Sequence, residues 1–138
     1  MRHKVNRNYH VPYLAGYSKD GRTVYIDKRV PTTIKTKAGD TVDIIKYLTI
    51  HESYEKGLED AEGLKYQAAH AKATAKEREA VEGDGHDWTA YQEAMAGYYE
   101  HARTEFTRAS VPADLDLEPY RDMKDTAILR KLGVKHGK

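Results

Sequence analysis

Residues 43–62 read DIIKYLTIHESYEKGLEDAE, and this stretch predicts the helix around which the rest of the chain is organised. Its apolar residues recur at helical spacing and define one stripe: Ile44, Tyr47, Leu48, Tyr54 and Leu58. His51 and Glu55 fall in the middle of that stripe, and Glu52 and Glu59 lie at its edge. The opposite face, expected to be solvated, carries Lys46, Ser53, Lys56 and Asp60. Burying ionisable groups is costly unless they are paired or bound to a metal, so the pattern predicts a compensating partner inside the protein.

The segment before this helix predicts a small antiparallel sheet of two or three strands. Residues 11–17 and 23–27 are rich in β-branched and aromatic side chains. The turn residues Asp20 and Gly21 between them indicate a hairpin. Residues 32–37 add a short extended piece before a second turn, and the chain then enters the organising helix.

The segment after this helix predicts two further long helices and a short one. Gly63 interrupts the first helix, and the spacing predicts a second helix over residues 64–82. A third helix is expected over residues 88–106, capped by Asp87, and a last short one over residues 122–132. The helix over residues 88–106 has a plain apolar stripe, which predicts that it packs in the core. The stripe consists of Trp88, Tyr91, Met95, Tyr98, Tyr99, Ala102 and Phe106.

These elements predict an α+β fold, in which a small antiparallel sheet is followed by a group of three or four helices. A chain of 138 residues is long enough for one domain with a sizeable core, so we expect residues 1–138 to form a single domain. Residues 1–10 and 133–138 are expected to be flexible tails.

Composition narrows the classes of function. The formal net charge is +1, with 23 basic and 22 acidic residues, which gives no electrostatic reason to expect a nucleic-acid or membrane partner. No segment has the apolar length of a membrane span or the pattern of a signal peptide, so we expect a soluble, cytoplasmic protein. Cysteine is absent, and any metal site must therefore use His, Asp and Glu. Eleven tyrosines suit a core whose hydroxyl groups find polar partners, and they equally suit an interface.

The second predicted helix, like the first, carries ionisable side chains on the face that is expected to be buried. His70 and Glu77 lie on the face of residues 64–82 that should pack inward, beside Tyr66, Ala73 and Val81. Two adjacent helices thus offer His and Glu side chains to a common interior, and a divalent metal between them is the simplest compensation. His51 and Glu55 are four residues apart and can reach one ion, with His70 as the third ligand. Two imidazoles and one carboxylate match a catalytic zinc set that leaves a position for water.

The remaining polar residues of these two faces have predicted roles around that metal. Glu52 is about a quarter turn from His51 and is placed to act as general base on a metal-activated water. Glu77 is either a further ligand or an acceptor for an imidazole N–H group. Tyr66 is placed to donate a hydrogen bond to a developing oxyanion.

The sequence HESYE at residues 51–55 resembles the HExxH signature of zincin metallopeptidases, with Glu55 in place of the second histidine. The order of strand, His-Glu helix and second helix is also similar, and the resemblance covers roughly residues 23–81. It implies that His51 is a zinc ligand, Glu52 the catalytic base and Glu55 the second ligand, while His70 matches only the general position of a distal ligand. It also implies a peptide or protein substrate. A carboxylate at the second position favours manganese or iron more than a histidine does.

Two classes of function follow. The first is a zincin-like metallohydrolase that cleaves a peptide or amide bond. The second is a non-enzymatic interaction protein in which buried pairs, such as His51 with Glu77 and His70 with Glu55, only stabilise the helices. The segment YQAAHAKATAKERE at residues 66–79 resembles parts of phage and bacterial proteins that carry no assigned function, which suits the accessory role of the second class.

Overall fold

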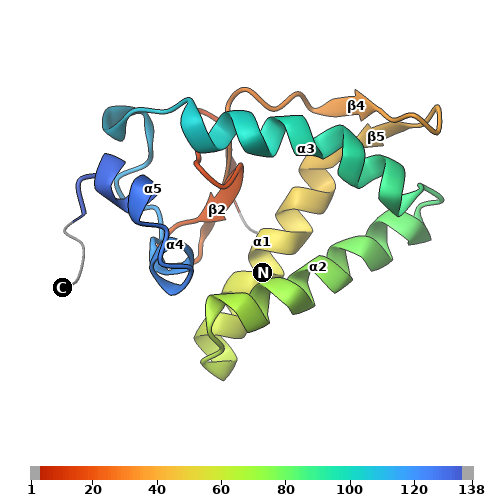
Figure 1. The fold of residues 1–138 in the computed structure, drawn as a ribbon. Helices are drawn as coiled ribbons and strands as arrows, with labels where there is room; N and C mark the ends of the chain where they lie inside the picture. Colours follow the sequence, from red (N-terminus) through yellow and green to blue (C-terminus); the bar gives the residue numbers. More distant parts are fainter. Residues whose placement is uncertain (1–3, 135–138) are drawn as a thin grey trace.

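Helix α1, which spans Ile44–Glu62, begins and ends where the sequence predicts (Figure 1). The structure is a computed structural model and describes residues 4–134. Asp43 caps the helix, since its carboxylate accepts a hydrogen bond from the Lys46 backbone N–H group. Gly63 ends it in the left-handed conformation, with φ of 66°, and its N–H group donates to the carbonyl of Glu59.

Two small sheets precede α1. Strands β2 (Ala15–Tyr17) and β3 (Thr23–Ile26) form the predicted antiparallel hairpin. Strand β1 (Lys4–Asn6) pairs in parallel with β3, which gives the sheet order β1-β3-β2. Strands β4 (Thr33–Lys35) and β5 (Thr41–Asp43) form a second antiparallel pair that leads directly into α1.

The N-terminal segment differs from the expectation of a flexible tail, because residues 4–6 belong to β1 and hydrogen-bond to the middle strand of the sheet. The predicted α+β fold is confirmed, and the first sheet has three strands, as expected. The described residues add the two-stranded β4–β5 sheet, and β1 pairs in parallel in a sheet that was expected to be antiparallel. Strands of three residues, such as β1 and β5, are too short to give an alternating pattern of their own. Residues 1–3 and 135–138, assigned to tails from the sequence, lie outside the described residues.

The remaining helices are α2 (Tyr66–Gly83), α3 (Trp88–Thr104), α4 (Glu118–Asp122) and α5 (Thr126–Lys131), with one 3-10 turn at Arg108–Ser110. Asp87 caps α3 as predicted, because its side chain accepts from the Ala90 N–H group. The single C-terminal helix expected over residues 122–132 is wrong. Lys124 has φ of 54°, and Asp125 starts a new helix by accepting from the Ile128 N–H group.

Burial along α1 follows the predicted stripe with two exceptions. Tyr54 was expected in the core but is 40% exposed, and the Lys76 ammonium lies over its ring. Lys56 was expected on the solvated face but is only 8% exposed, because its ammonium pairs with Asp116 Oδ2 at 2.8 Å and Asp60 Oδ1 at 3.2 Å. Contacts with the C-terminal segment therefore bury a face that periodicity assigns to solvent.

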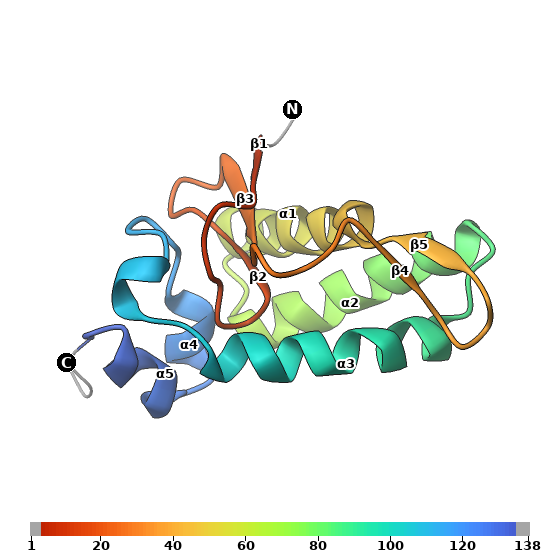
Figure 2. The same ribbon diagram turned by 90° about the horizontal axis from the view of Figure 1, so that it is seen from above.

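The three long helices lie side by side in Figure 2, with α2 between α1 and α3 in that view. The β1-β3-β2 sheet packs on α1, and α4 and α5 lie at one end of the helices. The β4–β5 hairpin lies toward the other end, where Asp40 contacts His86 of the α2–α3 loop at 3.2 Å. Among residues 4–134 no helix combines the length and apolar character needed to cross a membrane.

Candidate metal centre

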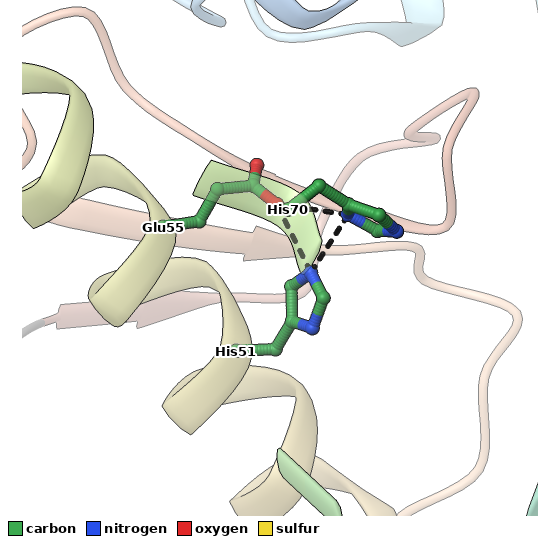
Figure 3. Close-up of side chains that lie close together, drawn as sticks. All are labelled: His51, Glu55 and His70. Carbon is green, nitrogen blue, oxygen red and sulfur yellow. Dashed lines mark hydrogen bonds and ion pairs between the residues drawn. The ribbon is translucent and has the colours of Figure 1, made fainter. Parts of the chain in front are cut away.

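Three of the predicted site residues converge on one point between α1 and α2 (Figure 3). His51 Nε2 lies 3.0 Å from Glu55 Oε2 and 3.1 Å from His70 Nδ1. His70 Nδ1 in turn lies 3.0 Å from the same Glu55 oxygen. One turn of α1 separates His51 from Glu55, and Gly63 turns the chain so that α2 brings His70 against both. These three side chains form a group that could hold a metal ion.

Hydrogen bonds alone do not satisfy all three contacts while Glu55 is ionised. If both imidazole nitrogens donate to Glu55 Oε2, then the two N–H groups also point at each other. If one nitrogen keeps its lone pair to accept, that lone pair faces the carboxylate oxygen. A cation between the three atoms would meet a lone pair from each. Ligands of a tetrahedral zinc ion lie roughly 3.4 Å apart, so a small outward movement of the side chains would admit one.

The hydrogen bond of His51 Nδ1 determines which ring nitrogen can bind a metal. His51 Nδ1 lies 2.9 Å from Glu77 Oε1. An ionised carboxylate can only accept a hydrogen bond, so Nδ1 carries a proton and donates to Glu77. Glu77 is itself held by the Tyr91 hydroxyl, which donates to its Oε2 at 2.7 Å. When Nε2 loses its proton, as metal binding requires, its lone pair faces Glu55 and His70. This carboxylate–imidazole arrangement is the usual support of a metal-bound histidine.

Glu77 is therefore placed differently from one of its predicted roles. It was a candidate metal ligand, but it lies at the Nδ1 edge of His51, on the side of the ring away from the group formed by His51 Nε2, Glu55 and His70. Its position matches the other role, that of an acceptor for the imidazole N–H group.

Glu55 is also held by groups outside the two helices. It is only 2% exposed, and its Oε1 accepts a hydrogen bond from the Tyr17 hydroxyl at 2.9 Å, which leaves Oε2 for the histidines. The same hydroxyl lies 3.1 Å from Glu59 Oε1. Sequence reasoning missed Tyr17 in β2 and assigned Tyr91 to the core alone. The one signal for both was the excess of tyrosine, which suits a core with polar partners.

The two predicted catalytic residues border the same point. Glu52 Oε2 lies 3.9 Å from His51 Nε2, and within the part of the chain that the structure describes the Glu52 carboxylate has no hydrogen-bond partner. The Tyr66 hydroxyl lies 3.1 Å from His70 Nδ1. His70 was expected to point inward, but its side chain is 46% exposed, so it lies at the rim of the interior group.

The pKa directions reflect this crowding of charges. Burial lowers the pKa of His51, but its hydrogen bonds to Glu55 and Glu77 outweigh burial and raise the pKa to about 10. Burial raises the pKa of Glu55, yet the hydrogen bonds from His51 and His70 prevail and hold that pKa below its usual value. Burial, reinforced by the charge of Glu55, raises the pKa of Glu52 well above the ordinary range. Without a metal, the site binds protons in its place.

The site opens into a large cleft with a volume of about 1110 Å³. Helix α1 supplies His51, Glu52 and Glu55 to its lining, and helices α2 and α3 also contribute lining residues. The loop before β2 and the region of α4 complete the lining with Tyr13 and Tyr120. Because Glu52 and the rim residue His70 line this cleft, the candidate metal centre can be reached from solvent.

Both pairs expected for a metal-free network are present as well, since His51 contacts Glu77 and His70 contacts Glu55. His51 Nε2 also lies 3.1 Å from His70 Nδ1, a contact that belongs to neither of these two pairs. Comparison of the chain with protein-family models, curated proteins and solved structures finds no match, so a functional assignment depends on the geometry of this site.

Proposed function

We propose that the chain is a metal-dependent hydrolase, of the zincin-like kind suggested by HESYE, that acts on peptide or amide bonds. The observation that supports this most is the convergence of His51 Nε2, Glu55 Oε2 and His70 Nδ1 at 3.0–3.1 Å, directly beside a carboxylate without a hydrogen-bond partner. Two nitrogen donors and one oxygen donor fit zinc in a site that keeps one position open. The same donors accept manganese or iron.

The chemistry assigned to each side chain follows from its position. His51, Glu55 and His70 would hold the divalent ion, which would lower the pKa of an adjacent water molecule toward neutrality. Glu52 Oε2 lies 3.9 Å from His51 Nε2, and from this position it would take the proton of that water as general base. The Tyr66 hydroxyl beside His70 donates to the oxyanion that develops on the substrate carbonyl.

Elemental analysis of protein purified without a metal-affinity tag tests the metal site. We expect about one equivalent of a divalent transition metal in the wild type, its loss in His51→Ala, and its retention in the exposed control His101→Ala. Glu52→Gln should keep the metal but lose at least roughly a hundredfold in hydrolysis of a casein or peptide-library substrate. A metal-free wild type contradicts the metal site, and unchanged hydrolysis in Glu52→Gln contradicts the assigned base.

A non-enzymatic interaction protein is the second candidate, and the His51–Glu77 and His70–Glu55 contacts favour it because they pair the buried groups without an ion. The double variant His51→Leu with Glu55→Leu separates the two functions. If the group is only structural, this variant should fold with unchanged or greater stability. A metal-dependent hydrolase would lose both metal and activity.

A further inference from the structure

The walls of the cleft extend well beyond the candidate metal centre. Helix α3 lines it from Trp88 to Thr104, which corresponds to about 24 Å at 1.5 Å per residue. This length accommodates roughly seven residues of an extended peptide. Gln67 of α2 and Gln92 of α3 also line the cleft, and side-chain amides can both donate to and accept from a peptide backbone.

The cleft is acidic although the whole chain is nearly neutral. Five carboxylates line it: Glu52, Glu55, Glu77, Glu100 and Asp116. Among the described residues no lysine does so. The lining includes Arg103, but this guanidinium forms a two-point pair with Asp125, at 2.8 and 3.2 Å. A divalent ion would offset the charges of Glu55 and Glu77, and Lys56 offsets that of Asp116. Glu100 therefore leaves the cleft negative whether or not Glu52 is ionised.

Aromatic rings accompany these carboxylates. Trp88, Tyr91 and Tyr99 line the cleft from α3, and Tyr13 and Tyr66 line it from other elements. The faces of such rings attract ammonium and guanidinium groups, and they also pack against the aliphatic stems of Lys and Arg. Carboxylates and aromatic rings together therefore select against anionic ligands and favour cationic ones.

We propose that the substrate class of this cleft is a linear peptide segment with lysine or arginine side chains, an inference that rests on the proposed hydrolase function. Glu100 is the carboxylate assigned to receive a basic side chain. It is exposed at the cleft, and no ion pair of Glu100 occurs within residues 4–134. Arg103, one turn further along α3, is directed to Asp125 and leaves Glu100 available for a ligand.

Trp88 is the only tryptophan of the chain and lines the cleft, so its fluorescence can report peptide binding directly, without an activity assay. Three eight-residue peptides without tryptophan, carrying lysines, only neutral residues or glutamates, are titrated into wild-type and Glu52→Gln protein while Trp88 fluorescence is recorded. We expect the lysine peptide to bind roughly tenfold more tightly than the neutral one at low salt, and the glutamate peptide to give no saturable change. This preference for the lysine peptide should shrink in 0.5 M salt, because the Debye length falls to about 4 Å and charges are screened.

A matched pair of variants tests Glu100. Glu100→Gln should weaken binding of the lysine peptide by roughly threefold to tenfold, whereas Glu93→Gln, exposed on the same helix and outside the cleft lining, should not change it. Equal affinity of wild type for all three peptides overturns the proposal, as does spermidine binding as tightly as the lysine peptide. If Glu100→Gln does not fold, the three-peptide comparison on wild type still decides. Basic-peptide binding without hydrolysis would reject the hydrolase function alone.

Discussion

His51 is the residue on which the candidate centre depends, because both of its ring nitrogens are engaged. Nδ1 faces Glu77 and Nε2 faces Glu55 and His70, and the ring is only 5% exposed. Without a metal, an imidazolium ion between two carboxylates is the favoured form of this side chain. Protons and a metal ion therefore compete for the same nitrogen, and metal binding near neutral pH must release a proton.

This competition predicts how the stability of the metal-free protein depends on pH. The pKa of His51 is about 10 in the folded state and about 6.5 when unfolded. A group with a raised folded pKa stabilises the protein fully below its unfolded pKa, and this contribution is lost as pH rises through the folded value. We expect the free energy of unfolding in chelator to fall between pH 6.5 and 10, by at most about 5 kcal/mol from His51.

Urea unfolding over this pH range measures the effect, with His51→Gln as the comparison. The variant lacks the titrating ring, and its stability should depend on pH much less than that of wild type. Parallel pH profiles for the two proteins would show that His51 does not carry the proton.

At the scale of elements, the α1–α2 hairpin brings the ligands together, and its turn depends on Gly63. Gly63 has φ of 66°, while Gly57 lies inside α1 with open space where a Cβ would stand. The same change to alanine should therefore have opposite effects at the two positions. Gly63→Ala should lower the free energy of unfolding by about 1 kcal/mol. Gly57→Ala should raise it by roughly 0.5–1 kcal/mol.

Chemical denaturation of both variants beside wild type checks this pair. A loss of stability in Gly57→Ala, or none in Gly63→Ala, would mean that the turn does not constrain the hairpin as the backbone angles indicate.

Elements with their own periodicity are the ones that the sequence predicts well. The three long helices begin and end within two residues of the expected positions, because each has an apolar face. Asp43 and Asp87 also cap α1 and α3, and Gly63 separates α2 from α1. The same periodicity identifies His51, Glu55 and His70 as one group. Periodicity does not reveal the supporting hydroxyl of Tyr17, because that residue lies in a three-residue strand whose place against α1 is set only by tertiary packing.

At the scale of the whole molecule, the C-terminal segment joins the sheet, α1 and α2 at one end of the cleft. Ser18 forms a bridge with Leu115, Lys56 pairs with Asp116, and Asp122 accepts from the Tyr66 N–H group. These contacts link residues 56 or more positions apart, so no local pattern could indicate them. They explain why Lys56 is buried on a face that the helical wheel assigns to solvent.

The Lys56–Asp116 pair allows this connection to be tested. Both side chains are nearly buried, at 10% and 9% exposure, so Lys56→Met leaves a buried carboxylate without its counter-charge. We expect a loss of about 3 kcal/mol in the free energy of unfolding, measured by urea denaturation. Adding Asp116→Asn should recover part of the loss, because it removes the uncompensated charge. A near-neutral effect of Lys56→Met alone would mean that the pair is solvated.

The position of all three ligands within residues 51–70 has a consequence for the order of folding. Contacts between residues close in sequence form before long-range ones, so the helical hairpin can assemble while the pairing of β1 with β3 and the packing of α3 are still incomplete. The full ligand set therefore belongs to the α1–α2 hairpin alone and does not need the later contacts to be complete. An ion captured at that stage would gain the supports of its ligands later, when the sheet brings the Tyr17 hydroxyl to Glu55 and α3 brings the Tyr91 hydroxyl to Glu77, so its affinity would rise as folding is completed.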